Sequence, residues 1–348
     1  MSSIIIWIHS AVNISDKIYN LKNCLDLKYK NVLFVCLDRG TLEFYRKKGF
    51  NIISLDDTFD QFTDTNFLEY PDFSSQDINI NILNNIFLLG SYKKSFLSKK
   101  YRNLFKDQYS EFILLLNYWN TIISKYKIKN SLILNGTSLA SFALAFASSQ
   151  RELKIVFWEN GLLPNSLFLN INGVNAFSKD YKFNQIKEIN NFNIYDFKKK
   201  FITLLKGKNK ILITLQVDHD SNIKLFSQFF SAVDLLTYID QLFSDQFHDL
   251  DIRFVVRKHP KSVINLNKFI KNRKKFSIST NKYFFDDLKN SDLVITINST
   301  TGLEAILSKK PLICFGNSFY SKFLRKYNIN YNNNNLKIFI YDPDDDDL

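Results

Sequence analysis

Polar residues that could do chemistry stand directly behind runs of strand-forming residues. The segment FVVRKHPKS places Lys258, His259 and Pro260 behind such a run. The chain holds only 4 histidines and 5 prolines, so a chance pairing at this place is uncommon. An imidazole can donate hydrogen bonds to phosphate oxygens, and proline stiffens the turn that aims it. We predict that this turn binds a phosphate group, although a His-Pro pair taken alone is more typical of a surface turn.

A second segment, NSTTGLEA, follows the strand-forming run VITI and begins a predicted helix near Gly302. Hydroxyl groups and the spare backbone N–H groups of a helix start together favour an anion. Without the His-Pro turn, the better reading would be that Ser299 or Thr300 only caps the helix. Glu304 could accept hydrogen bonds from ribose hydroxyls or be a solvated first-turn carboxylate. The residues predicted to bind phosphate are Asn298, Ser299, Thr300 and Thr301.

Three carboxylates, those of Glu159, Asp218 and Asp220, also follow predicted strands. Transfer of a glycosyl group needs an acid or base and, where configuration is retained, often a carboxylate nucleophile. Spacing in the sequence does not assign these roles, and each carboxylate is equally well read as a surface residue. The other polar or small residues behind these strands are Asn135, Asn160, Gly161 and Gln216.

Two series of alternating strands and helices position these residues. In the first, NVLFVCLD, TLEFYRKKG and FNIIS read as strand, helix and strand, and SLILN, SLASFALAFASSQ and LKIVFWENG repeat that order. The alternation restarts after residues 179–209 with KILITLQ, IRFVVRKHP, DLVITIN and PLICFG. Ligands of open parallel sheets bind beyond the carboxyl ends of the strands, where the polar residues fall. We therefore predict an α/β fold of two Rossmann-like domains facing a cleft.

The predicted boundaries follow from this alternation and from length, since 348 residues exceed what one core usually absorbs. We place one Rossmann-like domain at 1–190 and a second at 205–335. The end of the chain, 336–348, closes on DPDDDDL and is predicted to be a disordered acidic tail.

The net charge of +12 favours an anionic partner. Basic residues gather in residues 92–106 and 196–210. In the first cluster, from Lys93 to Lys106, apolar residues at helical spacing among the lysines suit a helix lying on an anionic membrane. An ordinary amphipathic helix with solvated lysines is the simpler reading.

Cysteine use and the start of the chain favour the cytoplasm. Cys36 and Cys314 lie in apolar runs, and an odd total of 3 suits a reducing compartment. The apolar start SIIIWIHS has no basic flank before it. No segment approaches the roughly 18 apolar residues of a membrane span.

Several enzyme classes lack their motifs in this chain. We find no GxGxxG after the early strand, no P-loop, no GxSxG elbow and no His or Cys spacing for a metal. We therefore expect neither metal nor cofactor. His9, His219 and His248 look incidental.

Four ordered segments resemble the capsule polysaccharide synthesis and export family: WENGLLP with the following NGVNAFS, then LQVDHDSNI, RKHPKS and INSTTGLEAIL. They span residues 158–307, whereas residues 1–130 match only in general architecture. Members of this family are β-Kdo glycosyltransferases, which transfer 3-deoxy-D-manno-oct-2-ulosonic acid (Kdo) from its CMP derivative. The resemblance implies a GT-B-like architecture, an N-terminal acceptor domain, a C-terminal donor domain, a retaining reaction and no metal.

The resemblance also implies roles for individual residues. The Gln-x-x-x-Asp segment, here Gln216 and Asp220, would supply a carboxylate that forms a covalent Kdo adduct. The Glu-x-Gly segment, here Glu159 and Gly161, would supply the acid or base for the acceptor hydroxyl. His259, its proline and the Ser-Thr-rich segment would hold CMP and stabilise the departing phosphate.

One departure concerns the acceptor. Relatives commonly carry an aromatic-Leu-Arg-Pro run after Glu-x-Gly, whereas this chain reads Leu162, Leu163 and Pro164 without the arginine. The expected donor is a CMP-activated sugar. The expected acceptor is a glycolipid or oligosaccharide, namely lysophosphatidylglycerol or a Kdo-terminated chain. The reaction is expected at the inner face of the bacterial inner membrane.

Three alternatives stay open. The chain could be a sialyltransferase-like or other nucleotide-sugar transferase. It could be a non-catalytic component of capsule assembly or export. A basic nucleic-acid binder is the third, although the sequence contains no recognised nucleic-acid module.

Overall fold

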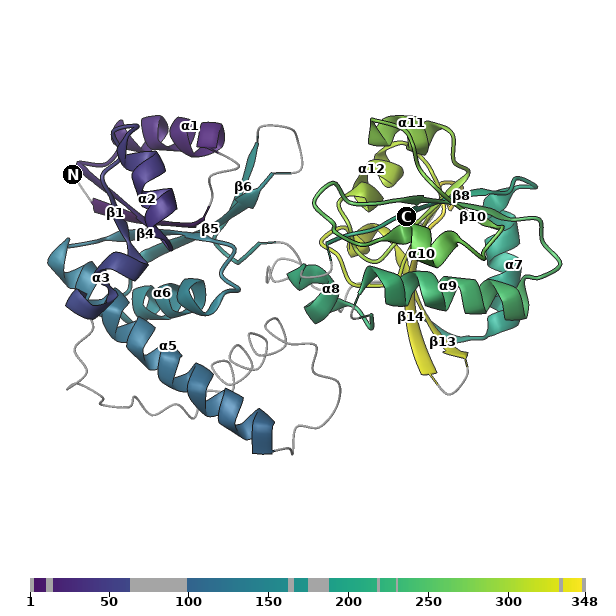
Figure 1. Cartoon of the computed structure of the whole chain (residues 1–348), viewed down its shortest axis with the longest axis horizontal. Helices are drawn as coiled ribbons and strands as arrows, with labels where there is room; N and C mark the ends of the chain where they lie inside the picture. Colours follow the sequence, from purple (N-terminus) through teal and green to yellow (C-terminus); the bar gives the residue numbers. More distant parts are fainter. Residues whose placement is uncertain are drawn as a thin grey trace. The chain divides into compact units, whose positions relative to one another are not determined.

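The structure, a computed structural model, describes residues 3–10, 15–62, 99–161, 166–174, 188–217, 220–229, 231–331 and 334–345. It consists of two compact units, Met1–Asp180 and Tyr181–Leu348 (Figure 1). Each unit has its own sheet with helices on both faces. The α/β class with two Rossmann-like units, predicted from the sequence, is confirmed.

The N-terminal unit is built on a six-stranded sheet in the order β3-β2-β1-β4-β5-β6. Neighbouring strands are parallel except β6, which pairs antiparallel with β5. The strands are β1 (Ser3–His9), β2 (Asn31–Cys36), β3 (Ile52–Ser54), β4 (Asn130–Leu134), β5 (Lys154–Asn160) and β6 (Leu167–Asn170). The helices are α1 (Ser15–Asp26), α2 (Arg39–Arg46), α3 (Leu55–Phe62), α5 (Lys99–Lys125) and α6 (Leu139–Gln150).

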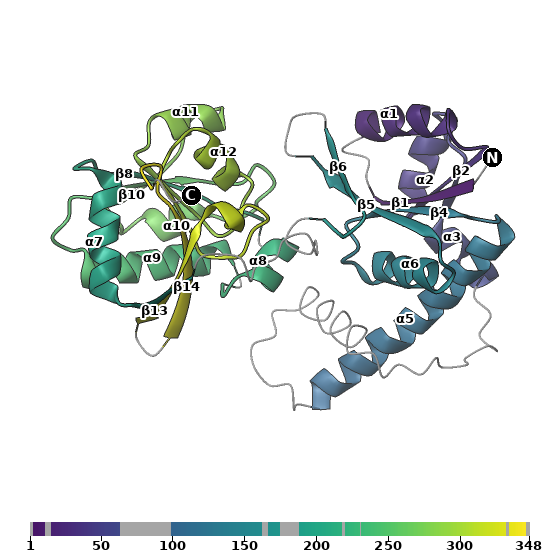
Figure 2. The ribbon, with the colours of Figure 1, turned by 180° about the vertical axis from the view of Figure 1, so that it is seen from behind.

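The central strand β1 shows why helices cover both faces of this sheet. Ile4, Ile6 and Ile8 pack with buried residues of α1 and α2. Ile5 and Trp7 point to the other face and pack with α5 and α6. Figure 2 shows α5 passing obliquely beside α6 on that face. A strand covered on both sides needs no polar face, which accounts for the apolar run in β1.

The C-terminal unit has an eight-stranded sheet in the order β10-β9-β8-β11-β12-β14-β13-β7. β14 is antiparallel to its neighbours β12 and β13, and the other neighbouring strands are parallel. The strands are β7 (Glu188–Phe192), β8 (Lys210–Thr214), β9 (Arg253–Arg257), β10 (Phe276–Ile278), β11 (Leu293–Thr296), β12 (Leu312–Cys314), β13 (Arg325–Tyr331) and β14 (Asn334–Tyr341). The helices are α7 (Ile194–Leu205), α8 (Ser221–Phe226), α9 (Ala232–Gln246), α10 (Leu266–Ile270), α11 (Phe284–Lys289) and α12 (Thr301–Leu307).

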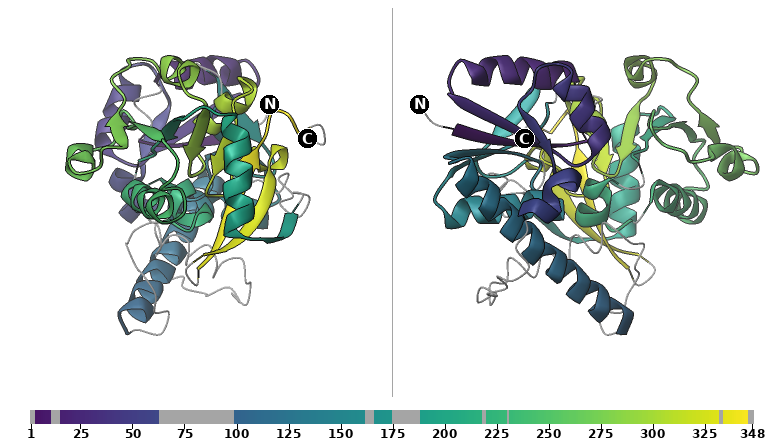
Figure 3. Two further views of the ribbon diagram at one scale, coloured as in Figure 1. Left: turned by 90° about the vertical axis from the view of Figure 1, so that its right-hand side faces the viewer. Right: turned by 60° about the vertical axis from the view of Figure 1, so that its left-hand side comes forward.

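Helices α7, α9 and α10 share one buried cluster of this unit, and α11 and α12 share the cluster on the opposite face. Figure 3 shows β13 and β14, in yellow, beside the teal helix α7. The carboxyl ends of β8, β9 and β11, which are parallel, consequently meet at one edge of the sheet.

The structure differs from the predicted domain boundaries at two places. The first unit ends at Asp180, and β7, whose first three residues fall inside the predicted range 1–190, pairs with β13 of the second. The segment predicted to be an acidic tail begins inside β14, where Leu336, Ile338 and Ile340 are buried. Alternating apolar residues in the strand explain this burial.

The acidic residues after β14 also have partners. Asp342 forms an ion pair with Lys200 at 2.6 Å, and Asp345 pairs with Arg325. Both side chains of the first pair are largely shielded from solvent. The chain is thus tied to the sheet as far as Asp345.

Candidate functional site

The strand order of the C-terminal sheet reverses between β8 and β11, and Gln216 and Asn298 lie just beyond these two strands. Both side chains are buried. Gln216 Nε2 donates to Asn298 Oδ1 at 3.0 Å, and Asn298 N donates to Gln216 Oε1 at 3.2 Å. Asn298 Nδ2 donates to the carbonyl oxygens of Asn222 and Asn317 at 2.7 and 3.1 Å. These hydrogen bonds fix three loops at the reversal point, where open α/β sheets bind ligands.

Asp220 lies beside this amide pair and begins α8. Its Oδ1 accepts hydrogen bonds from Asn222 N and Asn222 Nδ2 at 2.9 and 3.1 Å, so Asp220 caps the helix. Its Oδ2 accepts a bond from Gln216 Nε2 at 3.4 Å. The cap therefore fixes the carboxyl group while Oδ2 keeps the longer and weaker contact.

His259 lies in the turn after β9 and is half-buried. The backbone N of Lys261 donates to His259 Nδ1 at 3.1 Å. A ring nitrogen that accepts a hydrogen bond carries no proton, so the neutral ring bears its proton on Nε2 and can donate from there. Burial lowers the pKa of His259, and the charge of Asp220 opposes this shift. His259 and Asp220 are thus close enough to interact. Of the neighbouring residues in this turn, Lys258 is half-buried and Pro260 is exposed.

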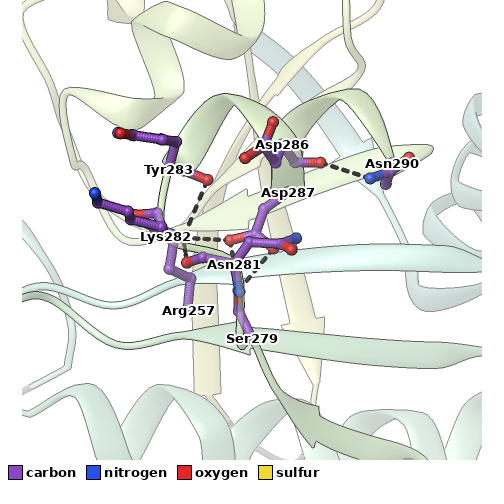
Figure 4. A network of polar contacts seen from close by, with 8 residues as sticks. All are labelled: Arg257, Ser279, Asn281, Lys282, Tyr283, Asp286, Asp287 and Asn290. Carbon is purple, nitrogen blue, oxygen red and sulfur yellow. Dashed lines mark hydrogen bonds and ion pairs between the residues drawn. The ribbon is translucent and has the colours of Figure 1, made fainter.

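Arg257, at the end of β9, fastens the strand that carries this turn. It forms an ion pair with buried Asp287 at 2.5 Å and donates to the carbonyl oxygens of Asn281 and Lys282 at 3.0 and 3.1 Å. Ser279 Oγ and Asn281 Nδ2 also donate to Asp287, each at 2.7 Å. Figure 4 shows these groups converging on Asp287. Charge-assisted bonds of this kind hold the end of β9 against the loop before α11.

The Ser-Thr-rich segment after β11 is held from two sides. Tyr320 OH donates to the carbonyl oxygen of Ser299 at 2.5 Å. Ser299 Oγ accepts a hydrogen bond from Thr301 N at 3.3 Å, whereas the side chain of Thr300 makes no capping bond. Ser299 is therefore the capping side chain of the two considered from the sequence. Glu304 is exposed on α12, and partial desolvation raises the pKa of its carboxyl group.

In the N-terminal sheet the strand order reverses between β1 and β4, and Asn135 follows β4. Asn135 Nδ2 donates to Glu159 Oε2 at 3.0 Å, and Asn160 N donates to Glu159 Oε1 at 3.0 Å. Gly161 then begins the connection to β6, where an added Cβ would lie 2.8 Å from the carbonyl carbon of Ser166. Glu159 is thus held by two donors at the carboxyl edge of this sheet.

A pocket of about 280 Å³ opens at this edge. Its polar lining comprises His9, Asn135, Thr137, Ser138, Ser141 and Glu159. His9, which sequence analysis set aside as incidental, is the last residue of β1. The sequence did contain a sign that His9 belongs to a site, because His9 follows a strand-forming run just as His259 does. Burial lowers the pKa of His9, and the charge of Asp38 opposes that shift.

Some predicted features lie outside the described residues. These are Asp218, His219, Leu162, Leu163, Pro164 and residues 93–98 of the basic cluster. Within the described ranges, no three His, Cys, Asp or Glu side chains are grouped as metal ligands would be. None of the helices described is both long and apolar enough to cross a membrane.

Two mostly parallel sheets with polar residues at their reversal points are typical of α/β proteins that bind ligands there. Residues 179–323 match the family described as capsule polysaccharide biosynthesis protein. This stretch holds LQVDHDSNI, RKHPKS and INSTTGLEAIL, and it confirms the resemblance predicted from these segments. The resemblance therefore covers most of the C-terminal unit, including the segments that hold Asp220 and His259.

Among curated proteins, the chain is 26% identical over 220 residues to Protein FixF of Sinorhizobium fredii. The match covers 60% of this chain and 54% of FixF, so the chain spans about half the length of this relative.

Solved structures similar to the chain include Thermosulfurimonas dismutans KpsC, a beta Kdo 2,7 transferase, with 18% identity and a TM-score of 0.40 over 72% of this chain and 79% of that one. An S. aureus MnaA-UDP co-structure has 12% identity and a TM-score of 0.37 over 91% and 80% of the two chains.

Proposed function

We propose that this chain is a retaining glycosyltransferase that moves β-Kdo from CMP-Kdo to a glycolipid acceptor in capsule polysaccharide biosynthesis. The placement of Asp220 carries the proposal. Its carboxyl group is fixed by the cap of α8 at the reversal point, beside Gln216 and close to His259. The family match supports the biological setting because it covers all three residues.

In the first proposed step, Asp220 Oδ2 attacks the anomeric carbon of CMP-Kdo. The bond from that carbon to the phosphate oxygen breaks, and its electron pair leaves with CMP. The Nε2–H of His259 and the hydroxyls of Ser299 and Thr300 donate to the phosphate as charge develops. The donor arrangement around Nδ1 of His259 favours this role because it directs the ring proton to Nε2.

In the second step, the acceptor hydroxyl oxygen attacks the same carbon and the Asp220 carboxylate leaves. Glu159 takes the hydroxyl proton as general base. Two inversions leave the β configuration. No step requires a metal or a cofactor.

The remaining residues have supporting roles in the proposal. Gln216 and Asn298 hold the loop that carries Asp220, as their mutual hydrogen bonds indicate. The residues proposed to surround CMP are Lys258, Pro260, Thr301 and Glu304. The residues proposed to hold Glu159 or the acceptor are Asn135, Asn160 and Gly161. The acceptor is lysophosphatidylglycerol or a Kdo-terminated glycolipid, met at the inner membrane through the basic cluster at Lys93–Lys106.

A transfer assay tests the proposal. CMP-Kdo is generated in situ and offered with lysophosphatidylglycerol or a Kdo-terminated glycolipid to the wild type and to Asp220→Ser. Serine is also a good helix cap, so this variant keeps the cap of α8 while losing the carboxylate. We expect a Kdo mass increment only with the wild type. Equal transfer by Asp220→Ser would refute the nucleophile, and CMP binding without Kdo transfer would direct the search to other CMP-sugars.

A further inference from the structure

His9 lies in the pocket of the N-terminal unit with an unusual backbone. Trp7 pairs with Val35 and His9 with Cys36, so β1 has one extra residue between two successive positions of β2. Such a bulge turns the following side chain out of the regular alternation and is common next to active sites. His9 has a φ of 50°, in the left-handed region that residues with a side chain rarely adopt.

The location of this conformation is informative. Among the described non-glycine residues with positive φ, Lys127, Glu152, Lys206 and Lys309 lie just after helices, where left-handed residues are an ordinary way to end a helix. The other two are His9 and Asn135, at 50° and 61°. His9 ends β1, Asn135 follows β4, and both line the same pocket. Unfavourable backbone conformations gather where the fold holds a side chain for function.

The pocket has the size and chemistry for a neutral hydroxyl-bearing group. About 280 Å³ is at the lower end of the roughly 300–1,000 Å³ of ligand pockets, which suits one sugar or glycerol group rather than a whole nucleotide sugar. Its lining offers hydroxyl and amide groups and one carboxylate. Within the described residues, no lysine or arginine lines it. A phosphate in this pocket would lie beside the Glu159 carboxylate, and like charges repel each other.

The imidazole of His9 adds both a donor and an acceptor to this lining. Burial lowers the pKa of His9 further than the charge of Asp38 can restore it. The ring is consequently neutral at pH 7, with one nitrogen able to accept a hydrogen bond from a hydroxyl group. Asn135 Nδ2 is turned to Glu159, which fixes the carboxylate on the same wall.

We propose that this pocket binds the neutral, hydroxyl-bearing end of the acceptor, and that His9 orients the reacting hydroxyl by hydrogen bonding beside Glu159. Charged parts of the acceptor, whether phosphate or carboxylate, lie outside the pocket. The assignment of the hydroxyl as the reacting one rests on the proposed function. The binding assignment stands independently of it.

Binding is tested with the full chain labelled with ¹³C at histidine Cε1. The His9 signal is identified by its loss in His9→Asn, because asparagine tolerates the left-handed backbone. The probes are glycerophosphoglycerol, which is the water-soluble head of lysophosphatidylglycerol, methyl β-Kdo glycoside and inorganic phosphate. We expect a saturable shift of the His9 signal with at least one of the two hydroxylated probes and no shift with phosphate. Because His9→Asn lacks this signal, calorimetry measures its affinity, which we expect to be about tenfold weaker. A response to phosphate alone, no response, or unchanged affinity in the variant would overturn the proposal.

Kinetics distinguish failure of this inference from failure of the proposed function. His9→Gly removes the side chain and relieves the backbone, and exposed His248→Asn is the matched control. We expect His9→Gly to lower kcat/KM for the acceptor by about 10²-fold, with partial rescue by added imidazole, while the Kd for CMP, whose proposed contacts lie in the other unit, stays unchanged. Full activity in His9→Gly would overturn the role of His9. If the wild type transfers nothing but the His9 signal still responds, the proposed function fails and the pocket assignment stands.

Discussion

Asp220 and Glu159 differ in how the protein engages their carboxyl groups. Asp220 is fixed as a helix cap, whereas Glu159 accepts hydrogen bonds from Asn135 and Asn160. If Glu159 is the base of the second step only, Glu159→Gln should let the Kdo adduct on Asp220 form and then accumulate. Mass spectrometry of the peptide that contains Asp220 measures this adduct. The double variant Glu159→Gln/Asp220→Ser is the control, and an increment that persists there would place the adduct elsewhere.

The buried pair of Gln216 and Asn298 gives a prediction for stability. Gln216→Leu keeps the size of the side chain but leaves Asn298 N and Asn298 Oδ1 without their partner. Leaving buried polar groups unpaired costs about 1–3 kcal/mol of unfolding free energy. Urea unfolding of the variant measures the loss. As a control, Gln61→Leu replaces an exposed glutamine and should change stability little.

At this scale the sequence predicts positions better than partners. Gln216, His259 and Asn298 were expected behind strands, and the structure has them there. The pairing of Gln216 with Asn298 joins residues 82 positions apart, so it depends on the order of β8 and β11 in the sheet. His9 was missed because a bulge and a left-handed backbone leave no periodic pattern in the sequence.

At the scale of elements, the start of α12 depends on a close contact between Gly302 and Tyr320. A Cβ at Gly302 would lie 2.3 Å from the Tyr320 hydroxyl oxygen and 2.7 Å from its Cζ. Gly302→Ala should therefore displace the ring and its hydrogen bond to Ser299, at a cost of about 1–3 kcal/mol. CMP binding should weaken as well, because Ser299 is proposed to contact the phosphate.

A double-mutant cycle checks that the contact is the cause. Tyr320→Leu removes the ring, so Gly302→Ala should cost less in that background, with a coupling of about 0.5–3 kcal/mol. Gly207→Ala is a useful comparison, since its Cβ would meet nothing within 4 Å and only its φ of 76° opposes the change. Additive effects of the two substitutions at 302 and 320 would contradict the steric explanation.

The same scale shows where sequence patterns stop. The parallel series from β8 to β12 follows from strand-helix alternation, and those strands are present. In contrast, β7 joins the sheet through β13, with Lys326 opposite Glu188. No local pattern reports a pairing over such a separation. The acidic residues after β14 led to the prediction of a disordered tail, although Leu336, Ile338 and Ile340 alternate as in a strand and are buried.

Considered as a whole, the molecule carries its candidate chemistry on two independent cores. The family match covers residues 179–323, nearly all of which lie in the unit with Asp220 and His259. Glu159 and His9 lie in the other unit. Each unit nevertheless gathers its polar residues at the reversal point of its own sheet, which is a property of the fold and not of the family sequence.

One physical property links both sites, namely histidines whose pKa values are lowered by burial, His9 and His259. As pH falls, the unfolded chain takes up protons on these residues before the folded chain does, and folding stability therefore decreases. The stability that the neutral histidines contribute is fully present above their pKa in the unfolded chain, about 6.5. It is lost as the pH falls through their lower pKa values in the folded chain. We expect the free energy of unfolding to decline between about pH 7 and 5, a range above that in which most carboxylates titrate.

Urea unfolding at a series of pH values tests this expectation. His9→Asn/His259→Asn should show a shallower decline than the wild type, because neither position then binds a proton in either state. His248→Asn, at an exposed position, should keep the wild-type slope. An unchanged slope in the double variant would mean that other groups cause the decline. If the double variant does flatten the decline, the single variants assign it by unit. Loss of the decline with His9→Asn alone assigns it to the half-buried imidazole of the N-terminal pocket, which must be neutral to accept a hydrogen bond from an acceptor hydroxyl.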